Sequence, residues 1–200
     1  MKYVDTIEKA FNVTDYPVFT IRDAALALKS KKIGDGYLRL MLHKYVKSGK
    51  IKRITRGAYT FHDDAIVVGF AFRPFYYGLE SALSMLGVSL QASNNIVMTT
   101  RNVRTGIRAF QGRNYEVVRI SSNLLFGFST IGVGNFWVPV SDLEKTLVDM
   151  LYLNIPIREE LYHAISKKLD RIKFGGYIKI LGQDFEASAN EKLKQIERLS

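Results

Sequence analysis

The sequence predicts an α+β protein, in which an N-terminal winged helix-turn-helix precedes an α+β domain with a small sheet and C-terminal helices. In the first fifty residues, apolar side chains recur at the three- and four-residue spacing of amphipathic helices. Two short alternating runs then flank a glycine, as in a β-hairpin. Later segments rich in β-branched residues alternate with helical patterns. We place the domain boundary after His62, so the domains are residues 1–62 and 63–200.

Composition indicates an ordinary globular protein. The 200 residues are 47% hydrophobic and 24% charged, and none is cysteine. The missing cysteines exclude disulfide scaffolds, thiolate zinc sites and cysteine nucleophiles. No stretch approaches the roughly 18 apolar residues of a membrane helix. The opening MKYVDTIEKAF has no signal-peptide core. We therefore expect a cytoplasmic protein with no membrane partner.

Positive charge is concentrated in the first third of the chain. The net charge is +10. Residues 1–62 contain 13 Lys and Arg against 5 Asp and Glu, whereas residues 63–200 contain 16 against 14. The N-terminal excess is therefore +8 and the remainder only +2. Such a one-sided basic excess is typical of a protein that binds a polyanion, although a solvated surface is the simpler alternative.

Local signals mark the N-terminal elements. Thr20 with Asp23 three residues later indicates a helix N-cap, and Gly49 occupies a C-cap position. Between the second and third helices, residues 31–36 form a turn rich in lysine and glycine. The predicted helices are Met1–Phe11, Ile21–Lys29 and Tyr37–Ser48, and the predicted hairpin strands are Ile51–Ile54 and Ala58–Phe61.

The polar face of the third helix carries no acidic residue. In a helix-turn-helix the second helix of the motif enters the major groove, and an adjacent hairpin contacts flanking backbone. Base edges are read by a few side chains, whereas Lys and Arg hold phosphates. We assign to the groove Tyr37, Arg39, His43 and Lys44. We assign to phosphates Lys31, Lys32, Lys47, Lys52, Arg53 and Arg56. A protein-docking winged helix is the alternative.

Three stretches of the chain resemble AbiEi-type antitoxins. The first is FTIRDAALALKSKKIGDGYLRLMLHKYVKSGKIKRITRGAYTF, the second is YYGLESALSMLG at residues 76–87, and the third is VSDLEKTLVDML at residues 140–151. The resemblance covers roughly residues 15–155, with Lys145 where the family often has arginine, and no motif follows Leu153. It implies autorepression at inverted repeats in the protein's own promoter. It also implies that the C-terminal domain counters a cognate toxin resembling nucleotidyltransferases.

The second domain is predicted from weaker patterns. The apolar run at residues 65–73 fits either a buried helix or a strand. The predicted helices are Phe75–Gly87, Asp142–Leu153, Pro156–Ile172 and Glu186–Leu199, and the predicted strands are Ile96–Thr100, Tyr115–Ser121 and one or two within Phe128–Val140.

No catalytic or metal motif stands out in this domain. Ser141 and Glu144 have capping-box spacing. Asp149 lies mid-helix among apolar residues, where it pairs with an arginine or faces a partner. The three histidines lack metal-ligand spacing, and Gly132-x-Gly134 is not a nucleotide loop. We expect no enzyme activity, cofactor or metal. A nuclease and a stand-alone transcriptional regulator, with a ligand-sensing or dimerisation domain, are the alternatives to an antitoxin.

Arginines gather in one stretch of the second domain. Five fall within nineteen residues, with Glu116 as the only acid among them. We interpret them either as solvated side chains or as a surface for an anionic partner, either flanking DNA or an acidic patch on the toxin. The candidates are Arg101, Arg104, Arg108, Arg113 and Arg119.

Overall fold

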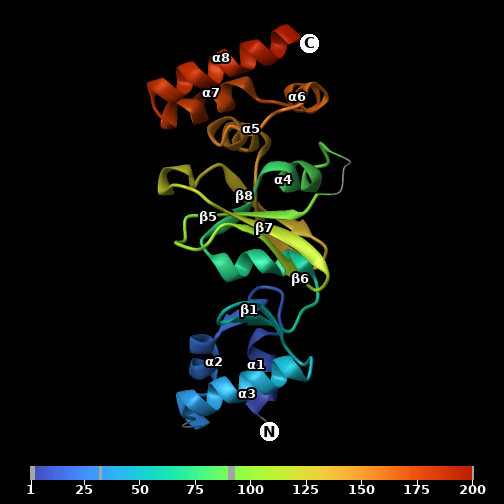
Figure 1. Ribbon diagram of the computed structural model, residues 1–200, viewed down its shortest axis with the longest axis vertical. Coiled ribbons are helices and arrows are strands. Elements are labelled where there is room, and N and C mark those ends of the chain that lie inside the picture. The colour runs from blue at the N-terminus through green and yellow to red at the C-terminus, as the bar shows by residue number, and fades with distance from the viewer. Residues whose placement is uncertain (1–2, 32, 90–92, 200) are drawn as a thin grey trace.

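The computed structural model describes residues 3–31, 33–89 and 93–199. It has three levels (Figure 1): a helical N-terminal region with a small sheet, a six-stranded sheet in the middle, and the C-terminal helices at the far end. The predicted α+β fold class is confirmed. Among the helices of the described residues, none combines the length and apolar character needed to cross a membrane.

The N-terminal region has the predicted order of helices and hairpin. Its three strands form an antiparallel sheet in the order β1-β3-β2, in which Phe19 lies opposite Tyr59. Phe19 is fully buried and stacks on Phe11 and Phe61. The elements are α1 (Tyr3–Phe11), β1 (Val18–Thr20), α2 (Ile21–Ala27), the short 3-10 helix η1 (Lys29–Lys31), α3 (Asp35–Lys47), β2 (Lys52–Thr55) and β3 (Ala58–Thr60).

Local capping explains where these helices begin and end. Thr20 and Asp23 form the predicted capping box, with the Asp23 amide donating to Thr20 Oγ1 at 3.2 Å. Gly49 has φ of +73° after the last turn of α3, as its C-cap position requires. The third helix begins at Asp35, two residues earlier than predicted, because Gly36 is accommodated within its first turn. Leu38 and Leu42 on its apolar face are buried.

The second region is built on a mixed sheet in the order β6-β7-β5-β4-β9-β8. Strands β5 and β7 are parallel, β4 and β9 are parallel, and the other neighbours are antiparallel. The strands are β4 (Phe75–Tyr77), β5 (Asn95–Thr99), β6 (Gly106–Phe110), β7 (Arg113–Arg119), β8 (Phe128–Val133) and β9 (Phe136–Ser141).

Two elements of this sheet differ from the prediction. Phe75–Tyr77 is a strand and not the first turn of a helix, because all three aromatic side chains are buried and the backbone pairs with β5 and β9. The helix α4 begins only at Leu79. Strand β6 was not predicted, since only its pairing with β7 distinguishes it from a loop. The undecided run of residues 65–73 contains the 3-10 helix η2 (Ala65–Phe72), capped by Asp64.

The helices that follow β4 in the chain lie on one face of the six-stranded sheet, whereas η2 lies on the other. The predicted helix Pro156–Ile172 is wrong in extent, because Asp170 caps a new helix and leaves Ile172 89% exposed. The remaining elements are α4 (Leu79–Met85), η3 (Ser122–Leu124), α5 (Leu143–Tyr152), α6 (Glu159–Ser166), α7 (Arg171–Ile180) and α8 (Gln183–Leu199).

Alternation along the strands divides the core into two layers. Tyr77 and Val97 face η2 and the small sheet, whereas Tyr76 and Met98 face the helices. Helix η2 lies between the two sheets (Figure 1) and contributes Val67 and Val68 to the layer that it shares with Ile54 of β2. The N-terminal region therefore packs directly on the second region, and the hydrophobic core is continuous across residue 62.

Candidate nucleic-acid interface

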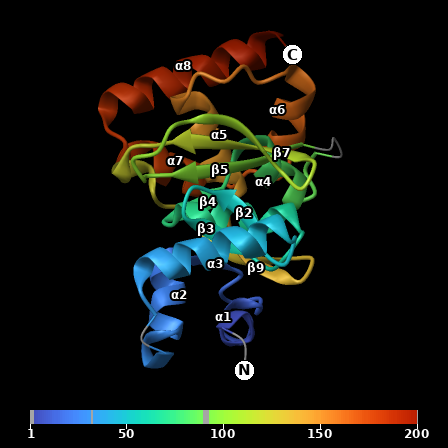
Figure 2. The ribbon, with the colours of Figure 1, turned by 60° about the horizontal axis from the view of Figure 1, so that its bottom comes forward.

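The exposed face of α3 carries four cationic or potentially cationic side chains. In Figure 2, which brings this end forward, α3 runs across the front of the ribbon. Tyr37 and Leu40 are 55% and 51% exposed. The other exposed residues of this face are Arg39, His43, Lys44 and Lys47. At 3.6 residues per turn, these six residues fall within an arc of about 160°, opposite the buried stripe of α3.

Most of the cations predicted to contact phosphates are exposed, but Lys52 is bonded within the fold. Lys31, Arg53 and Arg56 are exposed beside α3 and on the hairpin. Lys52 is half-buried, and its Nζ donates to Phe61 O at 3.0 Å and to Asp63 Oδ2 at 3.1 Å. We therefore leave Lys52 out of the interface. Lys32 lies outside the described residues.

These cations are not neutralised within the fold. In the described part of the chain, no ion pair involves Arg39, Lys44 or Lys47 of α3, or the exposed Lys31, Arg53 and Arg56. Exposed cations without acidic partners remain available to phosphates. We define this set, together with Tyr37 and His43, as the basic face.

The arginines of the second region do not form one surface. Arg101, Arg104 and Arg108 line a cavity together with Arg56 of the hairpin. Arg113 borders a different cavity, beside Asp64 and Asn95. Arg119 donates to Asn102 Oδ1 at 2.9 Å. The proximity of these residues in sequence therefore misrepresents their arrangement in space.

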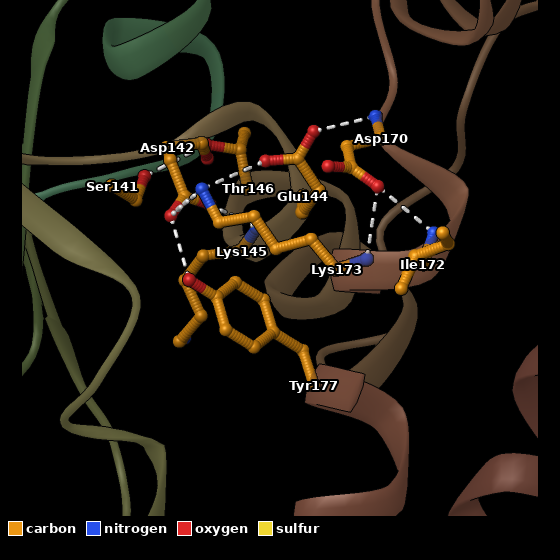
Figure 3. Close-up of polar contacts among 9 residues, drawn as sticks. All are labelled: Ser141, Asp142, Glu144, Lys145, Thr146, Asp170, Ile172, Lys173 and Tyr177. Carbon is orange, nitrogen blue, oxygen red and sulfur yellow. Dashed lines mark hydrogen bonds and ion pairs between the residues drawn. The ribbon is translucent and has the colours of Figure 1, made fainter. Parts of the chain in front are cut away.

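A second polar site surrounds the start of α5, within the VSDLEKTLVDML stretch (Figure 3). Asp142 is the N-cap, and it accepts the Lys145 amide at 2.8 Å. The same carboxylate accepts Tyr177 OH at 2.8 Å and Lys173 Nζ at 3.0 Å from α7. The bond to Asp142 raises the pKa of Lys173. Burial and the bond to Asp142 raise the pKa of Tyr177 to about 12.

The predicted capping box of Ser141 and Glu144 is wrong. Because Asp142 takes the N-cap position, Ser141 shares a hydrogen bond with Thr146 Oγ1 at 2.7 Å instead. Glu144 is buried and accepts the amide of Asp170, the N-cap of α7, at 2.9 Å. Ser141 therefore connects α5 to β4, and Glu144 connects α5 to α7. Figure 3 shows the bond between Glu144 and Asp170.

Asp149 has a partner that the sequence analysis missed. It pairs with Lys145 of the same helix, and both side chains are completely buried. Tyr76 OH donates to Asp149 Oδ2 at 2.8 Å and accepts from Lys145 Nζ at 2.9 Å. Burial raises the pKa of Asp149 and lowers that of Lys145, whereas their mutual attraction opposes both shifts. Asp149 therefore neither meets an arginine nor faces solvent.

One signal in the sequence points to part of this cluster. Lys145 and Asp149 are four residues apart, the spacing at which side chains on a helix meet. Tyr76 lies 73 positions away from Asp149, and no local pattern connects them. Each polar atom of these three side chains has an internal partner, so all the bonds of the cluster are completed within the fold.

No family model matches the chain, and no curated protein matches it. The resemblance to AbiEi-type antitoxins therefore depends on the three quoted stretches alone. Within residues 3–31, 33–89 and 93–199, no three His, Asp or Glu side chains are grouped closely enough to hold a metal ion.

Proposed function

We propose that this chain is a winged-helix DNA-binding protein that recognises double-stranded DNA, at its own promoter, through the basic face. The observation that carries the proposal is the row of exposed cations on α3 and the hairpin, none of which has an acidic partner in the described residues. Releasing counterions from DNA phosphates supplies much of the affinity of such a surface.

The mechanism follows from the arrangement of α3. Its exposed arc enters the major groove, where Arg39 bonds a guanine edge and Tyr37 and His43 contact neighbouring bases. Lys47 on the same arc and Arg53 on the hairpin hold phosphates and set the register. The buried stripe of Leu38 and Leu42 anchors α3 to the rest of the region, so the side chains are presented by a rigid element.

Fluorescence anisotropy tests this proposal. We expect the protein to bind the duplex from upstream of its own gene more tightly than a scrambled duplex of the same length, with a steep salt dependence. Arg39→Ala should cost about 1–3 kcal/mol of binding free energy on the upstream duplex and reduce the preference for that duplex. Lys47→Ala should weaken binding to both duplexes equally and lower the slope of log K against log salt by about 1. Equal and weak binding to both duplexes would sink the proposal.

Within this proposal the protein is an AbiEi-like antitoxin and not an enzyme. Support comes from the resemblance, which implies that the second region counters a nucleotidyltransferase-like toxin, and composition favours a cytoplasmic protein. Because Lys145 and Asp149 of the VSDLEKTLVDML stretch are buried, we propose other residues for the toxin contacts. If a nucleotidyltransferase-like gene lies next to this one, co-expression of the two tests this role, because an antitoxin should rescue growth and a stand-alone regulator should not.

A further inference from the structure

A cavity of about 240 Å³ lies where the hairpin meets the second region. The turn of the hairpin supplies Thr55 and Arg56, and Thr20 lies beside them. The opposite wall comes from η2 and from the chain between β5 and the end of β6, which supplies Arg101, Arg104 and Arg108. We call this site the wing-junction pocket. Neither region forms it alone.

Four arginines and no carboxylate line the wing-junction pocket. In the described part of the chain, none of the four makes an ion pair. Cations gathered around one cavity repel each other, and the repulsion is relieved when an anion enters. The pocket therefore has the electrostatic character of an anion site.

Two of the arginines are held in place by neutral groups. Arg101 Nη1 donates to Ala71 O at 2.8 Å. Arg108 Nη1 donates to Thr55 Oγ1 at 3.3 Å, and its guanidinium lies over the Phe72 ring at 5.1 Å from the centroid. These contacts position the guanidinium groups without neutralising them. Arg104 and Arg56 are exposed at the rim, and in the described part of the chain their side-chain donors have no hydrogen-bond partner.

The donors match a phosphate group better than a carboxylate. A guanidinium bonds two phosphate oxygens at once, and several of them surround a tetrahedral anion from different sides. Thr20 and Thr55 add hydroxyl groups to the wall. A cavity of about 240 Å³ has room for a phosphate with part of the molecule that carries it.

We propose that the wing-junction pocket binds a phosphate group, shared between Arg56 of the hairpin and Arg101, Arg104 and Arg108 of the second region. The phosphate comes either from a phosphorylated small molecule or from the DNA backbone beside the hairpin; the DNA source rests on the proposed function. In both cases the bound phosphate fixes the hairpin against the second region.

Calorimetric titration with pyrophosphate, at constant ionic strength in chloride, tests the pocket. We expect Arg101→Ala/Arg104→Ala to weaken pyrophosphate binding by about tenfold or more, because two arginines that would bond the anion are lost. The matched control is Lys167→Ala/Lys179→Ala, which removes the same charge from exposed sites outside the pocket. It should bind within about twofold of the unmodified protein. If the double variant unfolds, Arg104→Ala alone serves, because the Arg104 side chain makes no hydrogen bond or ion pair within residues 3–31, 33–89 and 93–199.

Titrating the same proteins with the upstream duplex identifies the source of the phosphate. Loss of pyrophosphate binding with unchanged DNA affinity identifies a small phosphorylated ligand. Weaker DNA binding by the pocket variant, but not by the control, identifies a backbone phosphate. If the pocket variant matches the control in both titrations, the proposal is wrong. If the unmodified protein fails to prefer the upstream duplex, the proposed function fails, while the pyrophosphate titration still decides the pocket.

Discussion

Charged groups are used in opposite ways at the two ends of this molecule. On the basic face, cations such as Arg39 and Lys47 are exposed and unpaired in the described residues. Within α5, Lys145 and Asp149 are completely buried and bonded to each other and to Tyr76. Exposed charges add little to the free energy of unfolding. Removing one partner of a buried ion pair, in contrast, lowers that free energy strongly.

The comparison separates binding from stability. Charges whose bonds are completed inside the fold have nothing left for a partner. Charges in solvent contribute little until a partner arrives. The variants below should therefore change either the free energy of unfolding or the affinity for DNA, but not both.

The largest effect is expected from Lys145→Met. This change leaves the Asp149 carboxylate buried without its counter-ion and should lower the free energy of unfolding by about 3–5 kcal/mol. Urea denaturation followed by circular dichroism measures the loss. The comparison fails if the loss is below about 1 kcal/mol, the range of an exposed pair.

The control for this change removes both charges. Lys145→Met/Asp149→Leu replaces the pair by apolar groups of similar volume, and we expect it to recover most of the stability that Lys145→Met loses. Tyr76 keeps its position in the core but loses both hydrogen-bond partners, so recovery should be incomplete.

On the basic face the same kind of change should act on affinity. Arg39→Ala/Lys44→Ala/Lys47→Ala should raise the Kd for the upstream duplex roughly a hundredfold at moderate salt, because three counterion-releasing contacts disappear. The urea midpoint should stay within error. The matched control, with the same loss of charge on exposed residues of the C-terminal helices, is Lys167→Ala/Lys179→Ala/Lys194→Ala. Equal weakening by both triple variants would mean that net charge alone decides binding.

An intermediate effect on stability is expected at the N-cap of α5. Asp142→Ala removes the cap and should cost about 0.5–2 kcal/mol of unfolding free energy. The bonds from Tyr177 and Lys173 disappear with it, so the cost should lie in the upper part of that range. Asp142→Asn, which retains a capping oxygen, should lose less in the same urea titration. An Asn variant as unstable as the Ala variant would assign the effect to the ion pair with Lys173.

The smallest effect concerns pH at the junction of the two regions. Burial lowers the pKa of His62, and its enclosed Nε2 has no hydrogen-bond partner among the described residues. The neutral form is therefore favoured in the folded state. Its contribution to stability is fully present above the ordinary pKa of about 6.5 and is lost as pH falls below it. Urea midpoints at about pH 7.5 and 5.5 should differ more for the unmodified protein than for His62→Gln. If the change in urea midpoint between the two pH values is the same for both proteins, His62 is not the group responsible.

Local patterns were enough to predict much of the N-terminal region. The Thr20–Asp23 capping box, the buried stripe of α3, the turn at Gly57 and the charge of the exposed face all follow from neighbours within a few positions. Such features depend on backbone geometry and helical periodicity, which the order of residues already specifies. The strands β5 and β7 were also predicted, because their β-branched residues form continuous runs.

Tertiary structure decided the features that depend on distant contacts. Phe75–Tyr77 became a strand because β5 and β9 offered backbone partners on both sides. Arg101 and Arg113 were separated onto different cavities by the pairing of β6 with β7. The burial of Lys145 and Asp149 required Tyr76 from a strand far away in sequence. Sequence alone determined the three N-terminal helices and the excess of positive charge in residues 1–62, since both are local properties. Which charges remain free for a partner was decided only by packing, because only packing brings distant groups within bonding distance.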